Sequence, residues 1–163
     1  MFPLKNKDGQ VVSFYGRSIA ATGKNKHYYL KNSQGLYPAY PPAGTQKLLI
    51  TESIIDTATL LQINSITSNF TLLAAYGTNR LTQEHLEAIS RLTYLGEIVF
   101  FFDGDDAGRR ATTKYAEQIH FLLPKVSISH IETPDGEDPN SLYVTYEESY
   151  ILELLNSRKQ LYS

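Results

Sequence analysis

The chain has 163 residues, which is enough for one domain with a full hydrophobic core and a small appendage. Its hydrophobic content of 42% is that of a globular protein, and no apolar run approaches the ~20 residues of a membrane-spanning helix, so we expect no contact with the membrane interior. The absence of cysteine excludes disulfides and thiolate metal sites within the chain and fits a cytoplasmic protein.

The charges are divided unevenly along the chain. Residues 1–47 hold seven basic side chains and one acidic side chain, a net +6, whereas residues 48–163 hold eight basic and sixteen acidic side chains, a net −8. Such a division indicates a polyanion on one side and a metal on the other, although two solvated surfaces of opposite sign are the simpler interpretation.

The first third of the chain predicts short strands. Residues 2–5, 11–15 and 28–30 are rich in β-forming side chains, and Lys7-Asp8-Gly9 is a strong hairpin signal between the first two. Residues 31–45 are rich in Gly, Pro, Ser and Asn, which predicts a loop or connector.

From Lys47 onward, apolar runs alternate with stretches of helical periodicity. The predicted strands cover residues 47–51, 70–75, 98–102 and 126–131, and the predicted helices cover residues 54–63, 82–92 and 107–123. A polar turn follows at 134–140, and the tail from 146 to 161 has a helical pattern. We therefore expect an α/β fold of Rossmann-like type, with a mainly parallel sheet, helices on both faces, and a small β-rich segment in front.

Acidic side chains follow two of the apolar strands. Asp103 and Asp105 come directly after the third strand, with a glycine between them, and Glu52 follows the first strand. If these strands are adjacent and parallel, their carboxyl ends bring the three acids together at the edge where open α/β sheets bind ligands. Hard oxygen ligands of this kind suit Mg²⁺ or Mn²⁺. Asp56, one helical turn after Glu52, and Asp138, in the later polar turn, are further candidate ligands.

Ordinary structural roles compete for several of these residues. Asp106 is most simply the N-cap of the third helix, and Asp56 is equally well explained as an acid in the positive first turn of a helix. Asp138 lies in a turn, where Asp is common in any case. Arg109 is a cation in the first turn of the third helix, where it opposes the helix dipole unless it meets an anion.

Several motifs together resemble the toprim domain of DnaG-type bacterial DNA primases. The matching strings are Phe14-Tyr-Gly-Arg17, Glu52-Ser-Ile-Ile-Asp56, Gly77-Thr78, Asp103-Gly-Asp-Asp-Ala-Gly-Arg-Arg-Ala111 and Pro134-Asp-Gly-Glu-Asp-Pro139. The long string that begins at Asp103 is specific, whereas isolated acids would not be. The resemblance implies three parts: residues 1–45 as the end of an upstream primase subdomain, 46–133 as the toprim domain, and 134–163 as an acidic loop with the start of a helical segment.

The resemblance also implies a function, namely metal-dependent nucleotidyl transfer that makes RNA primers from NTPs on a single-stranded DNA template. Glu52, Asp103 and Asp105 would be catalytic, and these three with Asp56 and Asp138 would bind Mg²⁺ or Mn²⁺. The implied contacts to nucleic-acid or nucleotide phosphates are Arg17, Lys26 and Arg109.

The chain departs from the family pattern in a few places. Ser53 stands where glycine is usual, and Asn140 stands where another Asp is common. The family's zinc-binding module and helicase-binding helices have no counterpart in this sequence, so we expect a catalytic core fragment or a reduced primase-like protein, which need not be active alone, and helicase contact only through regions absent here. A toprim-type nuclease using the same acids and a non-catalytic toprim nucleic-acid-binding module are the alternatives.

Overall fold

The N-terminal part forms a small antiparallel sheet. The computed structural model describes residues 1–18, 27–30, 34–77 and 81–163. The sheet has the order β1-β2-β3, with bounds β1 (Phe2–Lys5), β2 (Val11–Arg17) and β3 (His27–Tyr29). The predicted hairpin joins β1 to β2: Asn6 Oδ1 accepts hydrogen bonds from the backbone N–H groups of Asp8 and Gln10, and Gly9 takes the positive φ (78°) that the turn requires.

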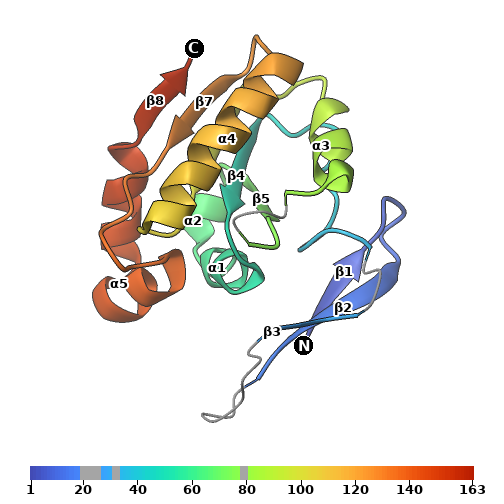
Figure 1. Ribbon diagram of the computed structural model, residues 1–163, viewed down its shortest axis with the longest axis horizontal. Helices are drawn as coiled ribbons and strands as arrows, with labels where there is room; N and C mark the ends of the chain where they lie inside the picture. The colour runs from blue at the N-terminus through green and yellow to red at the C-terminus, as the bar shows by residue number, and fades with distance from the viewer. Residues whose placement is uncertain (19–26, 31–33, 78–80) are drawn as a thin grey trace.

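The second sheet has five strands in the order β5-β4-β6-β7-β8 (Figure 1). Their bounds are β4 (Lys47–Thr51), β5 (Thr71–Ala74), β6 (Glu97–Phe101), β7 (Ser127–His130) and β8 (Lys159–Tyr162). The first four strands pair in parallel and β8 pairs antiparallel with β7. Because β4 and β6 are parallel neighbours, their carboxyl ends lie side by side, which is the condition under which the sequence predicted that Glu52 and Asp103 come together.

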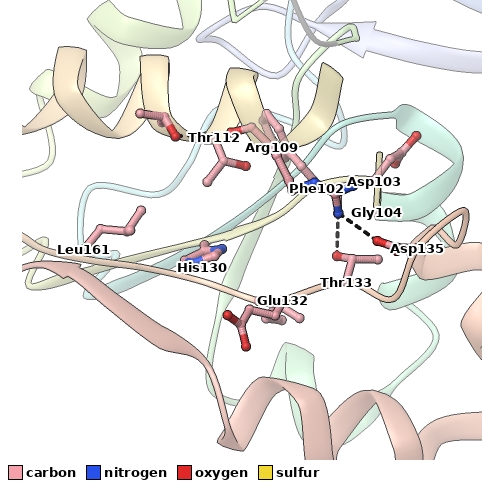
Figure 2. Close-up of a pocket in the computed structure, with 12 residues that line it drawn as sticks. Phe102, Asp103, Gly104, Arg109, Thr112, His130, Glu132, Thr133, Asp135 and Leu161 are labelled. Atoms are coloured by element: carbon pink, nitrogen blue, oxygen red, sulfur yellow. Dashed lines mark hydrogen bonds and ion pairs between the residues drawn. The ribbon is translucent and has the colours of Figure 1, made fainter. Parts of the chain in front are cut away.

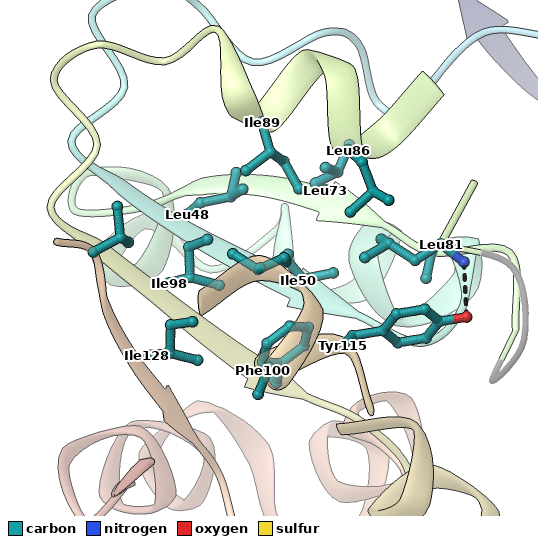
Figure 3. Packing of buried hydrophobic residues seen from close by; sticks show 14 of the residues in the cluster. Leu48, Ile50, Leu73, Leu81, Leu86, Ile89, Ile98, Phe100, Tyr115 and Ile128 are labelled. Atoms are coloured by element: carbon teal, nitrogen blue, oxygen red, sulfur yellow. Dashed lines mark hydrogen bonds between the residues drawn. The ribbon is translucent and has the colours of Figure 1, made fainter. Parts of the chain in front are cut away.

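Helices cover both faces of this sheet. Their bounds are α1 (Ile54–Leu60), α2 (Asn64–Thr67), α3 (Gln83–Ser90), α4 (Asp106–Leu122) and α5 (Pro139–Asn156). Ile50 and Phe100 belong to the core cluster that contains α3 and α4 residues, whereas Leu49 and Phe101 belong to the cluster that contains α1 and α5 residues. Successive strand residues thus face opposite layers, and Figure 3 shows the packing on the α3–α4 side.

The small sheet packs against the carboxyl-terminal edge of the large sheet. Leu4 and Tyr15 are fully buried in a third cluster with Ile54 and Tyr76. A pair of backbone hydrogen bonds between Lys5 and Leu36 continues this contact into the connector. This packing places β2 and β3 in front of the strand ends that carry the acids.

The structure confirms the predicted α/β fold and corrects three details of the predicted elements. The predicted helix over 54–63 ends at Leu60, and the short α2 follows it. The predicted polar turn is shorter than 134–140, because Asp138 caps α5 and Pro139 occupies its first turn, where a missing N–H costs nothing. The tail is helical only to Asn156 and then forms β8.

Within the described residues, no helix is long and apolar enough to span a membrane.

Candidate active site

A cleft of about 520 Å³ lies between the small sheet and the carboxyl ends of β4 and β6. Polar residues of the large sheet and its helices form one wall: Glu52, Ser53, Asp56, Asp103, Asp138 and Asn140. The other wall comes mainly from β2 and β3 and consists of Tyr15, Arg17, His27 and Tyr29. The cleft therefore has an acidic wall on one side and an aromatic, basic wall on the other.

Glu52 and Asp103 form the centre of the acidic wall. Their strands are in register, with Thr51 beside Phe101, so the two acids that follow emerge together. Glu52 Oε2 accepts a long hydrogen bond of 3.5 Å from the backbone N–H of Asp103. Asp103 Oδ1 is buried and has no hydrogen-bond partner among the described residues. A buried, unpaired carboxylate oxygen is costly, which indicates that a positively charged group belongs beside it.

Burial and mutual repulsion raise the pKa of both acids. Burial raises the pKa of Asp103 to about 8, and the negative charge of Glu52 adds to the effect. The pKa of Glu52 is raised to about 7, again mainly by burial, with the charge of Asp105 contributing. Without a cation the pair therefore holds protons near neutral pH, and a bound cation would release them.

Asp56 lies deeper, in the first turn of α1. Its Oδ2 accepts a hydrogen bond of 2.5 Å from the Ser53 hydroxyl, and its Oδ1 accepts one of 3.3 Å from the backbone N–H of Asn140. Burial raises the pKa of Asp56 to about 6. Asp56 is therefore an acid in the first turn of α1, as one interpretation of the sequence had it, and it also lines the cleft. Its role as a metal ligand stays a prediction.

Two of the predicted ligands also cap helices. Asp105 Oδ1 accepts a hydrogen bond of 2.6 Å from the Gly108 N–H at the start of α4, and Asp138 Oδ1 accepts one of 2.6 Å from the Ser141 N–H at the start of α5. The assignment of Asp106 as the N-cap of α4 is therefore wrong. Asp105 has the extended backbone of a cap, whereas Asp106 is the exposed first residue of the helix.

Gly104 holds the β6–α4 turn against the loop that leads to Asp138. Its N–H donates to the Glu137 carbonyl (2.8 Å), and its own carbonyl accepts from the Gly136 N–H (2.9 Å). A Cβ at this position would lie 1.9 Å from the Pro134 carbonyl oxygen, so only glycine permits the approach. This contact brings Asp138 to the cleft that Asp103 lines.

The acids have the chemistry to bind a divalent cation, although their side chains are not arranged as a complete coordination site. Among the described parts of the chain, no three acidic or histidine side chains converge as metal ligands. Uncompensated carboxylates repel one another, so a tight cluster is not expected before a cation is bound. The buried Asp103 oxygen that has no partner among the described residues and the carboxylate of Glu52 beside it are oxygen ligands of the kind that a hard cation requires.

The predicted basic residues are placed unequally. Arg17, at the end of β2, lines the cleft opposite the acids. Lys26 lies outside the described residues. Arg109 is not among the residues that line the cleft: it is exposed and pairs with Asp135 at 3.0 Å and Asp106 at 3.4 Å. Figure 2 shows Arg109 reaching towards Asp135 in a second pocket of about 430 Å³, which both residues line and which shares Asp103 with the cleft.

Sequence reasoning missed the aromatic wall of the cleft. The Tyr15 hydroxyl shares a hydrogen bond of 2.8 Å with His27 Nδ1, and the Tyr15 ring centroid lies 4.9 Å from that of Tyr29. Tyr29 in turn contacts Tyr76 at 5.5 Å. Residues 11–15 show no apolar–polar alternation in sequence, so nothing there indicates that Tyr15 is buried, and only the packing of the two sheets places it opposite the acids.

The sequence and the fold match known proteins. A protein-family model described as Toprim-like matches residues 49–143. The DNA primase of Borreliella burgdorferi is 31% identical over 169 residues, which cover 97% of this chain and 30% of that protein. A crystal structure of a DNA primase domain from Pseudomonas aeruginosa matches with a TM-score of 0.79 and 25% identity over 98% of this chain and 51% of that one. A DnaG primase catalytic domain bound to single-stranded DNA matches with a TM-score of 0.76 and 24% identity, over 98% of this chain and 51% of that one.

The chain belongs to the toprim-like family, and its toprim domain is of the DnaG-primase type. It spans between 25% and 30% of the length of the DNA primases from Salmonella typhimurium, Borreliella burgdorferi and Staphylococcus aureus that it matches.

Proposed function

We propose that the cleft is the catalytic centre of a DNA primase, where NTPs are joined into RNA primers on a single-stranded DNA template. The observation that carries this proposal is the pairing of Glu52 with Asp103, whose buried Oδ1 has no partner in the described part of the chain, opposite a wall that carries Arg17. An acidic wall binds divalent cations, and a basic wall binds phosphates, so one cleft accommodates both parts of a metal–nucleotide complex.

Glu52, Asp103 and Asp105 are proposed as the catalytic acids, and Asp138 and Asp56 complete the set that holds Mg²⁺ or Mn²⁺. Such cations would lower the pKa of an attacking 3′-hydroxyl and stabilise the negative charge of a pyrophosphate leaving group. The protein orients its carboxylates through the caps of α4 and α5 and through the contact between Gly104 and the loop before α5.

The opposite wall is proposed to bind and orient the nucleic acid. Arg17 would contact a phosphate, and the contacting rings of Tyr15 and Tyr29 lie in the same wall of the cleft. The similar DnaG domain was solved with single-stranded DNA, which supports the same class of ligand here. The proposed role in replication implies a cytoplasmic location, and contact with a replicative helicase remains a prediction from the resemblance.

Primer synthesis and strand cleavage separate this proposal from the nuclease alternative. The chain is incubated with single-stranded DNA, NTPs and Mn²⁺, and in parallel with supercoiled plasmid and Mn²⁺. We expect RNA products that disappear in Asp103→Asn and no plasmid nicking. Nicking without RNA synthesis would instead assign the acids to phosphodiester hydrolysis, and binding of DNA without either reaction would leave a nucleic-acid-binding module.

A further inference from the structure

We propose that Ser53 and Asn140 weaken the Asp56 end of the cleft as a cation site, so that one divalent cation binds at the Glu52–Asp103 end and a second binds much more weakly. This inference rests on the proposed metal-dependent function. It concerns two positions at which this sequence departs from the motif pattern that the resemblance implies, and the structure brings both of them into contact with Asp56.

The acids of the cleft differ in how many of their oxygens are already engaged. Both carboxylate oxygens of Asp56 accept hydrogen bonds, and its side chain is only 3% exposed. Asp103, by contrast, has a buried Oδ1 with no partner among the described residues. A cation that approaches Asp103 meets an oxygen with no hydrogen bond from the described residues, whereas one that approaches Asp56 must share both oxygens with protein donors.

Ser53 restrains Asp56 from within the same helical turn. Its Oγ accepts from the Asp56 N–H at 3.2 Å and donates to Asp56 Oδ2 at 2.5 Å. The hydroxyl therefore caps α1 and holds the carboxylate at the same time. A glycine at this position would keep an acceptable cap and leave Asp56 Oδ2 without this donor.

Asn140 contributes a neutral side chain where an acid would add charge. Its side-chain oxygen accepts from the Thr59 hydroxyl at 2.8 Å, while its backbone N–H donates to Asp56 Oδ1. Affinity for a divalent cation depends on the number of charged ligands, so an amide here supports binding less than a carboxylate would. The two departures therefore act in the same direction on one end of the cleft.

Mn²⁺ titration followed by the electron paramagnetic resonance signal of the free ion tests the inference. We expect the unmodified chain to bind one Mn²⁺ tightly and a second weakly. Ser53→Gly and Asn140→Asp should each tighten the second binding step without changing the first, by about tenfold for Asn140→Asp, which adds a charged ligand. Ser53→Thr keeps a hydroxyl and should retain the weak second step.

The matched control is Asn64→Asp, which adds the same charge at an exposed position of α2 that does not line the cleft, and which should leave both steps unchanged. Circular dichroism establishes that each variant is folded. Two equally tight Mn²⁺ ions in the unmodified chain, or a second step that neither Ser53→Gly nor Asn140→Asp tightens, would overturn the inference and leave the proposed function intact. No Mn²⁺ binding at all would refute the proposed function itself.

Discussion

At the scale of single residues, the cleft depends on carboxylates that are buried before any cation compensates them. Glu52, Asp56 and Asp103 all have raised pKa values, and burial is the largest cause for each. Packing alone gives no advantage to three such acids in one place, because each disfavours ionisation of the others. The free-energy cost of burying these carboxylates together is consistent with a functional site rather than with a stabilising network.

This cost predicts an unusual pH dependence for the metal-free protein. Acids whose folded pKa exceeds the unfolded value bind more protons in the folded state, so their contribution is fully present below the unfolded pKa and is lost as pH rises through the folded pKa. With folded pKa values of about 7 for Glu52, 6 for Asp56 and 8 for Asp103, the melting temperature in EDTA should fall between about pH 5 and about pH 8.

The matched variant for this measurement is Asp103→Asn, which removes the acid with the highest of the three pKa values and should flatten the fall. Added Mg²⁺ should raise the melting temperature more at pH 8 than at pH 6, because the cation competes with fewer protons there. A melting temperature that rises steadily with pH in EDTA would contradict the burial of these acids.

At the scale of elements, the turn between β6 and α4 serves as a helix cap and as a wall of the cleft. Removal of the cap in Asp105→Ala should destabilise the protein by about 1 kcal/mol in urea unfolding. Asp106→Ala, the neighbouring control, removes only an exposed pair with Arg109 and should cost less than about 0.5 kcal/mol. Equal costs for the two variants would contradict the assignment of Asp105 as the cap.

Gly104 gives a second prediction for the same turn. Gly104→Ala places a methyl group against the Pro134 carbonyl and should cost about 3 kcal/mol or more, because backbone atoms have to move. Gly44→Ala meets no atom within 4 Å and should change the stability by less than about 0.5 kcal/mol. Chemical denaturation measures both, and a neutral Gly104→Ala would contradict the close approach of the two loops.

The strands were predictable from sequence, whereas their relation to the C-terminal segment was not. The parallel strands are apolar runs buried on both faces, so a run such as residues 98–102 is recognisable as a strand from the sequence alone. β8 is exposed or half-buried along its length and carries no such signal; its pairing with β7 depends on tertiary contact. The choice between Asp105 and Asp106 as the cap depends on which of the two residues has the extended backbone that precedes the helix, and the sequence does not determine this.

At the scale of the whole molecule, the small sheet and the toprim sheet supply opposite walls of one cleft. The sequence indicated the convergence of Glu52 with Asp103 on the condition that their strands are neighbours, because the β-α-β pattern implies parallel strands but does not determine their order. It could not indicate that Arg17 and Tyr15 face these acids, because that depends on how the two sheets pack. The uneven division of charge along the chain is consistent with this arrangement.

The arrangement predicts weak, salt-sensitive binding of single-stranded DNA. Arg17→Ala should lower the affinity and reduce the slope of log K against log salt concentration by about 0.7, the value for one phosphate contact on a single strand. Arg110→Ala, an exposed arginine of α4 that does not line the cleft, is the control. Fluorescence anisotropy with a labelled oligonucleotide measures both, and an unchanged slope in Arg17→Ala would exclude that phosphate contact.

The central claim is that Glu52, Asp103 and Asp105 hold a divalent cation, and isothermal titration calorimetry with Mn²⁺ tests it most directly. The unmodified chain should give a saturable binding heat that is lost in the double variant Asp103→Asn/Asp105→Asn, since asparagine can still cap α4 while both charges are removed. The absence of any saturable heat in the unmodified chain, or the same heat in the double variant, would contradict the account.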